Sequence, residues 1–599
     1  MSIVSHLLAW LTSRIELNCP LEFASTLSDA DSQRLPRPPI SLLDRPDCGP
    51  TSPINIGIVG AGISGLYLAM LLDELQIPFL TYDILESSER TGGRVFTYRF
   101  GGNTKDYYDV GAMRFPNAST IPPLRRTIDF FQTIGVKLIP YDMKGENCPH
   151  MFNSIRHIPG SSATCGFDPF KMSVSNGGLV PDGTISEGAE AILQRTFRPF
   201  KNRLAEDFGA GFRELLKFDH YTMRDYLRHE MGYDFYSIWY LETICSASGL
   251  YDQSLSEAVL DSLDFDYTSG SGGDVDWYQI EGGTSQVVDW MERKILRKPI
   301  HGKRVRKMSY NEHEAAYPVG VEADGEAQIR KYTAVFNTTS LPCLRRMELK
   351  GNILSAGQKA AIQSVHYDSS TKVAVKFKRQ WWSSHCGIRG GQASTDLPIR
   401  TCVYPSGSST STVLLCSYTW GQDAQQLGSL ADQNSSRSQS ELKQLLIHNL
   451  ALLHQECQGS PSSPHNYSKM YDIIQNEYES HHAVNWYNDP HSSGAFAYFG
   501  PGQFVNFYPE LVKPAADGHV YLVGEACSAH HGWIAGALES VRRALAQFIH
   551  KLALNNQISA DVLQKAWDKL GCVEEIEPEV LEWHVFLGEL SKQMKITSI

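Results

Sequence analysis

The 599-residue sequence lacks three features: a membrane-spanning run, a cysteine pattern typical of metal or disulfide frameworks, and a surplus of basic charge. Its longest nearly uncharged stretch, Ile54 to Leu72, contains four glycines, whereas a spanning helix needs about 20 predominantly apolar residues. The twelve cysteines are scattered without a C-x-x-C pair, so neither a zinc site nor a disulfide framework is expected. Acidic residues outnumber basic ones by 66 to 54, and this balance argues against broad nucleic-acid binding. No metal, nucleic acid or membrane-spanning segment is therefore predicted.

The composition is otherwise that of an ordinary globular protein. Hydrophobic residues make up 42% of the chain and charged residues 20%, and the length suits roughly two to four domains. Residues 1–52 are predicted to be an N-terminal extension, because the stretch RLPRPPISLLDRPDCGP is rich in proline. The apolar run at the start has no basic n-region, so a signal peptide is not expected. We predict an intracellular, cytoplasmic location.

A glycine-rich turn opens the globular part of the sequence. Residues 56–59 predict an apolar strand, and Gly60-Ala61-Gly62-Ile63-Ser64-Gly65 leads into an apolar helix. Such glycines permit a tight turn, close approach of a pyrophosphate and close packing of helix on strand, while the helix N-terminus supplies N–H groups. A second predicted strand ends at Glu86, at the distance expected for a carboxylate that binds a ribose diol. The pattern predicts a dinucleotide-binding unit.

The residues after this strand indicate which dinucleotide is bound. The run from Glu86 to Val95, ESSERTGGRV, resembles the E-A-x-x-R-x-G-G-R signature of the flavin amine oxidase family. Gly93 would let the backbone close over the dinucleotide, and Arg94 could bind phosphate through its planar guanidinium. The resemblance favours FAD over a nicotinamide cofactor.

A second family motif lies near the end of the sequence. VYLVGEACSAHHGWIAGALESVRRA resembles the closing flavin motif of the same family. The resemblance implies that Gly524 allows close approach of the backbone, that Glu525 accepts from ribityl hydroxyls, and that Gly532 and Trp533 flank the flavin ring. The helix beginning near Ile534 would point its N-terminus at the flavin. A weaker candidate contact is Val305, which would pack on adenine. His530 and His531 are expected to make hydrogen bonds at the edge of the cofactor.

One arginine indicates what the substrate looks like. The segment YYDVGAMRFP resembles the G-x-M-R-x-P form of L-amino-acid oxidases, in which the arginine binds the substrate carboxylate. The resemblance assigns this role to Arg114, and a guanidinium suits a carboxylate because the two form paired charge-assisted hydrogen bonds. Alternatively, Arg114 would contact flavin phosphate or a structural acid. The remaining predicted cofactor contacts in this segment are Gly111, Ala112 and Met113.

Other residues are assigned from the same resemblance. Residues 364–405 are similar to L-amino-acid oxidases, and their V-Y-P run implies that the Tyr404 hydroxyl assists the arginine. Phe496 is a candidate for the substrate pocket together with Gly532 and Trp533. Lys359 is the candidate for a lysine that holds a water near the flavin in many family members. Monoamine oxidases carry a cysteine linked to flavin in the segment corresponding to SSGAFAYF. This sequence has Gly494-Ala495 there, so FAD is expected to be bound non-covalently.

These motifs predict a doubly wound α/β FAD-binding domain with a β-rich substrate domain and a helical insert. The predicted segments are 53–100, 278–345 and 505–555 for the FAD domain, 101–164 and 346–504 for the substrate domain, 165–277 for the insert and 556–599 for a helical tail. The predicted activity is oxidative deamination of an L-amino acid by oxygen to a 2-oxo acid, ammonia and hydrogen peroxide. Alternatives are an amino-acid 2-monooxygenase, a biosynthetic oxidase of a modified amino acid, a monoamine or polyamine oxidase, and a non-catalytic protein like GDP-dissociation inhibitors. The resemblance also raises the prospect of a homodimer.

Overall fold

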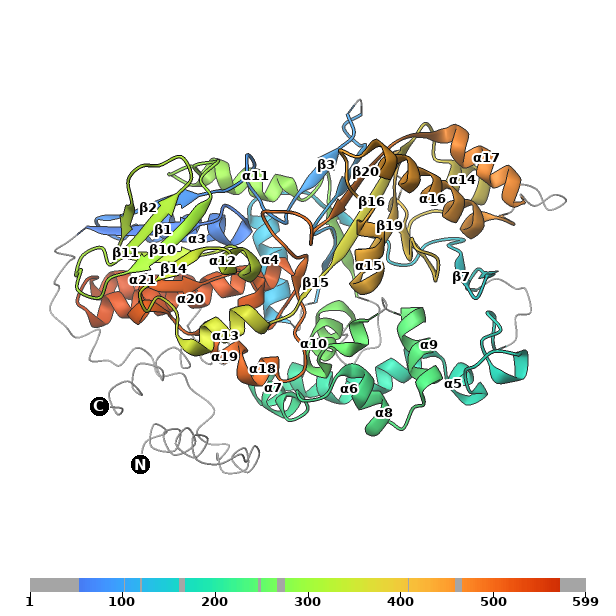
Figure 1. The fold of residues 1–599 in the computed structure, drawn as a ribbon, viewed down its shortest axis with the longest axis horizontal. Helices are drawn as coiled ribbons and strands as arrows, with labels where there is room; N and C mark the ends of the chain where they lie inside the picture. The colour runs from blue at the N-terminus through green and yellow to red at the C-terminus, as the bar shows by residue number, and fades with distance from the viewer. Residues whose placement is uncertain are drawn as a thin grey trace.

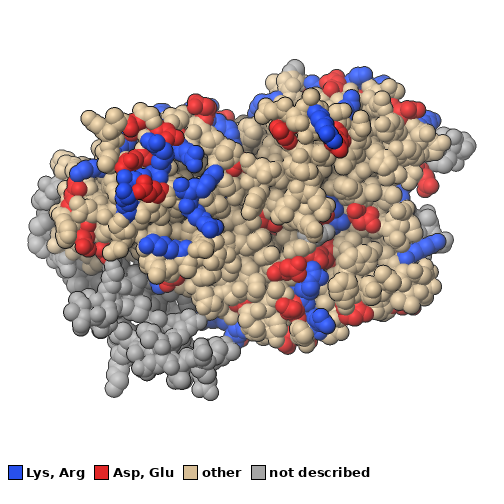
Figure 2. All heavy atoms as spheres, in the orientation of Figure 1, with Lys and Arg blue, Asp and Glu red and all other residues tan. Residues whose placement is uncertain are grey.

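The computed structural model describes residues 53–101, 103–118, 121–160, 167–245, 249–266, 275–407, 409–457 and 466–570. The predicted extension 1–52 and residues 571–599 of the predicted tail lie outside this part of the chain. None of the described helices combines the length and apolar character that crossing a bilayer requires. On the face shown in Figure 2, basic and acidic side chains are interspersed and are not separated by sign.

A four-stranded parallel sheet forms the first part of the fold. Its strand order is β2 (Leu80–Leu85), β1 (Ile54–Val59), β13 (Ala334–Asn337) and β22 (Val520–Leu522). The strands come from three widely separated segments of the chain, and Figure 1 shows blue, green and red elements side by side in this region. A parallel sheet brings the carboxyl ends of its strands to one edge, which is where ligands bind in such folds.

Helices cover one face of this sheet and a second sheet covers the other. The helices are α3 (Ile63–Leu75), α11 (Ser285–Lys294) and α20 (Ile534–Leu554), which share an apolar cluster with Ile56 and Ile58 of β1. The second sheet has the order β12 (Arg330–Tyr332), β11 (Val319–Ala323), β10 (Val305–Tyr310) and β14 (Glu348–Lys350). Tyr332 from this sheet packs so closely that a Cβ at Gly57 would lie 2.8 Å from its ring. A glycine is therefore needed in the middle of β1.

A seven-stranded sheet makes the second part of the molecule, at the upper right of Figure 1. The central strands β16 (Ser370–Phe377) and β19 (Val413–Trp420) are antiparallel neighbours. The remaining strands are β20 (Tyr478–Asn485), β18 (Thr401–Val403), β17 (Gln392–Thr395), β7 (His150–Phe152) and β8 (Ile155–His157). Helices α14 (Trp381–Cys386), α15 (Gly421–Gly428), α16 (Ser436–His454) and α17 (Tyr467–Glu477) belong to this part.

A group of helices forms the third part, at the lower right of Figure 1. It consists of α5 (Asp182–Glu187), α6 (Ala189–Glu206), α7 (Phe208–Leu216), α8 (Met223–His229), α9 (Phe235–Cys245) and α10 (Leu255–Asp266). The molecule therefore has the predicted fold class, with a parallel α/β sheet, a β-rich part and a helical insert. The residue boundaries of the three domains stay a prediction.

Candidate active site

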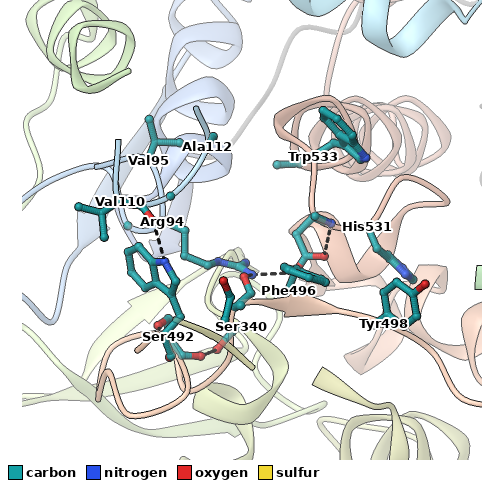
Figure 3. A pocket seen from close by; sticks show the side chains of 18 of the residues that line it. Arg94, Val95, Val110, Ala112, Ser340, Ser492, Phe496, Tyr498, His531 and Trp533 are labelled. Carbon is teal, nitrogen blue, oxygen red and sulfur yellow. Dashed lines mark hydrogen bonds and ion pairs between the residues drawn. The ribbon is translucent and has the colours of Figure 1, made fainter. Parts of the chain in front are cut away.

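One cavity of about 680 Å³ extends along the carboxyl edge of the parallel sheet and continues between the seven-stranded sheet and the helical insert. Segments more than 400 residues apart contribute to its walls. Figure 3 shows the Arg94 side chain pointing toward Phe496, with Ala112 on one side of it and Ser340 on the other. The predicted cofactor residues that line the cavity are Gly60, Gly62, Ser64, Glu86, Gly93, Arg94, Gly111, Ala112, Met113, Arg114, Val305, Gly524, Glu525, Gly532, Trp533 and Ile534. Their individual roles stay predictions.

The glycine-rich turn shapes one end of the cavity. Gly60 has a φ of 109°, which glycine adopts readily, and a Cβ at Gly65 would lie 2.1 Å from the Gly60 carbonyl oxygen. Gly65 does not line the cavity, but it allows helix α3 to begin directly against the turn. By contrast, a Cβ at Gly62 or Gly524 would meet no atom within 4 Å. These two glycines therefore leave open the space that the backbone of a dinucleotide needs, and this end of the cavity fits FAD.

The Glu86 carboxylate connects the second strand to the glycine turn. Glu86 Oε2 accepts a hydrogen bond from the Ala61 N–H at 2.7 Å, and its Oε1 accepts one from the Ser88 N–H at 2.8 Å. The side chain is buried, yet the residue lines the cavity beside the turn. This position is compatible with the predicted contact to a ribose.

Arg94 and Glu525 form an ion pair in the middle of the cavity wall. Arg94 Nη1 donates to Glu525 Oε1 at 2.8 Å and to the Ala495 carbonyl at 2.8 Å. Glu525 also accepts from the Ala497 N–H at 3.2 Å. Burial lowers the pKa of Arg94, but the Glu525 carboxylate outweighs burial, and the pKa is raised. The two residues that were assigned to phosphate and to ribityl hydroxyls thus hold each other, and they tie both halves of the flavin signature together.

Gly111 lets the next segment pass close to the Arg94 backbone. A Cβ at Gly111 would lie 1.6 Å from the Arg94 carbonyl oxygen, so no larger residue fits. The Trp486 indole N–H donates to the Val110 carbonyl at 3.1 Å and fixes the segment from the other side. Residues 111–114 consequently face the cavity.

The Arg114 guanidinium lies among aromatic rings. Its Cζ is 4.9 Å from the centroid of Phe265, 5.8 Å from that of Trp277 and 6.0 Å from that of Tyr141. Its Nη1 lies 3.5 Å from the Met143 sulfur. Within the described residues, no carboxylate forms an ion pair with this guanidinium. Because arginine stays charged and aromatic faces attract cations only weakly, Arg114 is suited to binding an anionic group that enters the cavity.

The other predicted substrate contacts lie nearby. Trp533 packs its ring 6.1 Å from Trp277 and 6.4 Å from Phe265, the same rings that surround Arg114. Gly532 has a φ of 76°, and a Cβ there would lie 3.5 Å from the Phe496 ring. The structure therefore brings Arg114, Phe496, Gly532 and Trp533 to one cavity.

Lys372 is a cavity residue that the sequence prediction missed. Its Nζ donates to the Asp109 carbonyl at 3.1 Å and to the Gly111 carbonyl at 2.7 Å, and it lies 4.5 Å from the Tyr418 ring centroid. Burial lowers its pKa to about 7. The alternation of STKVAVKF could have indicated it, because Lys372 falls on the same face of the strand as Ala374, which packs near the cavity.

Lys359 lies elsewhere. It is exposed on helix α13 (Ala356–Ser364) and is not among the residues that line the cavity. The buried residue of this helix at the neighbouring position is Gln358, which completes a capping box with Ser355 and does not face the cavity. Packing and the capping box therefore explain this helix, and Lys372 is a lysine that the fold does place in the cavity wall.

Tyr404 also lies away from the cavity. Its hydroxyl bonds to His454 Nε2 at 2.5 Å, and its ring is 1% exposed in the apolar cluster with Trp381. The preceding Val403 packs in a different cluster, with Trp486 and Ala374. Successive side chains of an extended segment point to opposite sides, so Val403 and its neighbour Tyr404 enter different clusters. The structure does not bring Tyr404 to the cavity that Arg114 lines, whereas the tyrosines Tyr251, Tyr418 and Tyr498 are among the residues that line it.

Two buried histidines lie behind Gly532. His531 Nδ1 bonds to Glu257 Oε2 at 2.8 Å, and His530 Nδ1 bonds to Asp264 Oδ2 at 2.8 Å. Of the two, His531 lines the cavity. Burial lowers the pKa of His531, but the Glu257 carboxylate outweighs burial and raises it. Both histidines therefore anchor the segment 530–533 to helix α10.

Comparisons with known proteins agree with this geometry. The profile of the family described as flavin containing amine oxidoreductase matches residues 63–547. A Dictyostelium discoideum protein named "Putative bifunctional amine oxidase" is 36% identical over 519 residues, which are 82% of this chain and 46% of that protein, so the chain spans about half of its length. L-amino-acid oxidase 4 of Hebeloma cylindrosporum is 33% identical over 547 residues, covering 84% of this chain and 83% of that protein. A structure of wild-type putrescine oxidase bound to putrescine has a TM-score of 0.60 at 16% identity, covers 84% of this chain and 100% of that one, and shares the fold.

Proposed function

Because the chain belongs to the flavin-containing amine oxidoreductase family, we propose that it oxidises an L-α-amino acid to the imino acid with FAD as its cofactor. Water then hydrolyses the imine to a 2-oxo acid and ammonia, and oxygen is reduced to hydrogen peroxide. Similarity to L-amino-acid oxidase 4 of Hebeloma cylindrosporum supports this substrate class.

The observation that carries the proposal is the position of Arg114. Its guanidinium lines the cavity, and within the described part of the chain it forms no ion pair with a carboxylate. A substrate carboxylate would form two charge-assisted hydrogen bonds with it. An amine that lacks the carboxylate would leave the arginine without a partner in a partly desolvated site, which disfavours plain amines.

The neighbouring residues would orient the rest of the substrate. Trp533 and Phe496 offer apolar surfaces on the cavity wall, and Lys372 Nζ is held between two backbone carbonyls beside Gly111. Since the pKa of Lys372 is lowered to about 7 by burial, this amine can hold or release a proton near neutral pH. When bound, FAD would supply the redox chemistry, as the acceptor of the hydride and the donor of electrons to oxygen.

We also propose that FAD is held without a covalent bond. Gly494 has a φ of 153°, and a Cβ at this position would lie 2.7 Å from the Tyr367 ring. A cysteine therefore does not fit at residue 494, and residue 495 is alanine. Acid precipitation of the holoprotein should release its flavin into the supernatant, and flavin retained in the pellet would contradict this.

The proposed function is tested with pairs of substrates that differ only in the carboxylate. The purified holoprotein is assayed for peroxide release with L-phenylalanine and phenethylamine, with L-leucine and 3-methylbutylamine, and with L-lysine and cadaverine. We expect peroxide with amino acids and little with the amines, because Arg114 would be left unpaired by the latter. The proposal fails if the amines react as well as or better than every amino acid.

Product analysis separates the oxidase from its nearest alternative. An oxidase gives a 2-oxo acid and peroxide in equal amounts. An amino-acid 2-monooxygenase would instead release carbon dioxide and leave an amide. Mass spectrometry of the organic product with a measurement of peroxide in the same sample distinguishes the two.

A further inference from the structure

The part of the molecule built on the seven-stranded sheet contains two cysteines in contact with each other. Cys386 is the last residue of α14, and Cys457 lies shortly after α16 ends at His454. The Cys386 thiol donates a hydrogen bond to the Cys457 sulfur, and the two sulfurs lie 2.6 Å apart. Figure 1 shows α14 and α16 in the same group of helices at the upper right. The fold thus brings together two thiols that are 71 residues apart in the sequence.

This cysteine pair is separate from the cavity. Neither cysteine is among the residues that line the cavity. Both are buried, with 8% of Cys386 and 2% of Cys457 exposed, and they belong to the apolar cluster that contains Trp381 and Leu446. The proposed reaction therefore makes no use of them.

The contact between the sulfurs makes the two thiols unequal. The hydrogen bond from Cys386 lowers the pKa of Cys457 in spite of burial, and the Arg156 charge lowers it further. Arg156 is held beside the pair, because its Nε donates to the Leu453 carbonyl of α16 at 3.1 Å. The pKa of Cys386 is raised, first by the hydrogen bond that it donates and then by burial. Cys457 is consequently the sulfur that becomes a thiolate, while Cys386 keeps its proton.

Other buried cysteines of the same cluster are held differently. The Cys148 thiol donates to the Gly390 carbonyl at 3.2 Å, and burial raises its pKa to about 12. Burial also raises the pKa of Cys402 and of Cys416. Thiols of this kind react slowly with oxidants, because the thiolate is the nucleophile. A thiolate with a second thiol beside it is instead typical of cysteines that respond to oxidation.

We infer that Cys386 and Cys457 form a modification site, at which hydrogen peroxide joins the two thiols in a disulfide bond. Peroxide is a product of the proposed reaction, but peroxide from any source would serve, so the inference goes beyond the proposed function and does not depend on it. Because both thiols are buried, a small oxidant is favoured over a bulky disulfide.

The modification takes two steps. The Cys457 thiolate attacks one oxygen of peroxide, the O–O bond breaks, and a sulfenic acid forms on Cys457 while the released hydroxide takes up a proton to become water. The Cys386 sulfur then gives up its proton and attacks the Cys457 sulfur, so that the S–O bond breaks, the S–S bond forms and a second water leaves. Both sulfurs are oxidised, and one peroxide is reduced to two waters. Because the sulfurs are already in contact, the second step needs no rearrangement of the two helices.

The bond would connect α14 to the chain that follows α16. A cross-link between residues so far apart restricts the unfolded chain, so it stabilises the folded state. We expect the oxidised protein to have a Tm about 4–10 °C above that of the reduced protein. Since neither cysteine lines the cavity, kcat/KM should change little.

The test maps the thiols of the full-length holoprotein. The purified protein is reduced and freed of reductant, and half of it is treated with hydrogen peroxide. Free thiols in both halves are then alkylated under denaturing conditions before proteolysis and mass spectrometry. We expect two peptides cross-linked through Cys386 and Cys457 in the treated half, and their separation by a dithiol reductant. Full alkylation of both thiols after a peroxide dose that oxidises methionines of the same chain, or further oxidation of Cys457 without a cross-link, would overturn the inference.

Matched variants separate the roles of the two thiols. In Cys386→Ala the sulfenic acid on Cys457 has no second thiol to meet, so a 1,3-diketone probe should trap it. Cys457→Ala should show neither the cross-link nor a trapped sulfenic acid on Cys386. Cys148→Ala, at another buried cysteine of the cluster, should form the cross-link as the wild type does.

Two controls keep the result interpretable. Flavin content and Tm of each variant report on folding, and the wild-type peptide map decides the inference even where a variant does not fold. Loss of the cross-link in a folded Cys148→Ala variant, or trapping at Cys386 in Cys457→Ala, would contradict the assigned roles. Because peroxide is added, a protein that oxidises no amino acid can still form the bond, so this inference and the proposed function fail independently.

Discussion

At its dinucleotide end the cavity is walled mainly by backbone, whereas at its substrate end it is walled by side chains. Gly60, Gly62 and Gly524 leave space for a ligand at the first end. Arg114, Lys372 and Trp533 project into the second. The shape of the backbone therefore decides which ligand fits at the first end, and the charge and polarity of side chains decide it at the second. A substitution at one end should leave the function of the other largely intact, which makes the comparison testable.

The largest effect is expected at the substrate end. Arg114→Met keeps much of the aliphatic contact with Phe265 but removes the charge, so kcat/KM for amino acids should fall about 1,000-fold. Flavin content should stay near one per chain, because the dinucleotide end is unchanged. Arg125→Met, on an arginine that is 55% exposed, serves as the control. Undiminished amino-acid oxidation in Arg114→Met would show that Arg114 does not hold the carboxylate.

At the dinucleotide end, Gly65→Ala should impair flavin binding and leave catalysis by the bound flavin unchanged. The added Cβ would lie 2.1 Å from the Gly60 carbonyl oxygen, so the turn must move, at a cost of about 1–3 kcal/mol in stability. We expect a lower Tm and weaker flavin binding, with activity per bound flavin unchanged. Gly62→Ala adds its methyl to open space, so it should weaken flavin binding without lowering the Tm of the flavin-free protein. Equal Tm values for the two flavin-free variants would refute this distinction.

The sequence predicts the dinucleotide end of the cavity better than the substrate end. Gly60, Gly62, Glu86 and Arg94 belong to short motifs whose geometry is local, and all four line the cavity. Lys359 and Tyr404 were assigned from the family resemblance. They lie in helix α13 and directly after strand β18, where a shift of one residue moves a side chain to another face. The sequence alone does not show which strand face meets the cavity, because that depends on packing between distant segments.

A smaller effect concerns pH and Lys372. Its pKa in the folded protein is about 7, below the ordinary value of 10.5. Between these values the unfolded chain binds a proton that the folded chain has released, so stability should rise with pH across this window, by up to about 1.4 kcal/mol per pH unit. Lys372→Met should remove this slope, as measured by denaturant unfolding at pH 7, 8 and 9. Lys350→Met, at a lysine that is 59% exposed, should keep it. A slope that persists in Lys372→Met would contradict the assignment.

The smallest effect is expected for Tyr404→Phe. The hydroxyl bonds to His454 in the core, so its loss should cost about 1 kcal/mol of stability and change kcat/KM less than about twofold. Tyr418→Phe removes the hydroxyl of a residue that lines the cavity and should lower kcat/KM further. A larger kinetic effect in Tyr404→Phe than in Tyr418→Phe would restore the original assignment of Tyr404 to the substrate.

The last strand of the parallel sheet has a consequence for biosynthesis. β22 pairs with β13, and shortly after β22 ends at Leu522 the chain reaches Glu525, which forms an ion pair with Arg94, translated 431 residues earlier. While the ribosome is still making the chain, the edge of β13 has no neighbour and the Arg94 guanidinium has no carboxylate to meet. Capture of the cofactor should therefore be a late event in the life of each nascent polypeptide, and chains that stop short of residue 525 should expose an unprotected strand edge that favours aggregation.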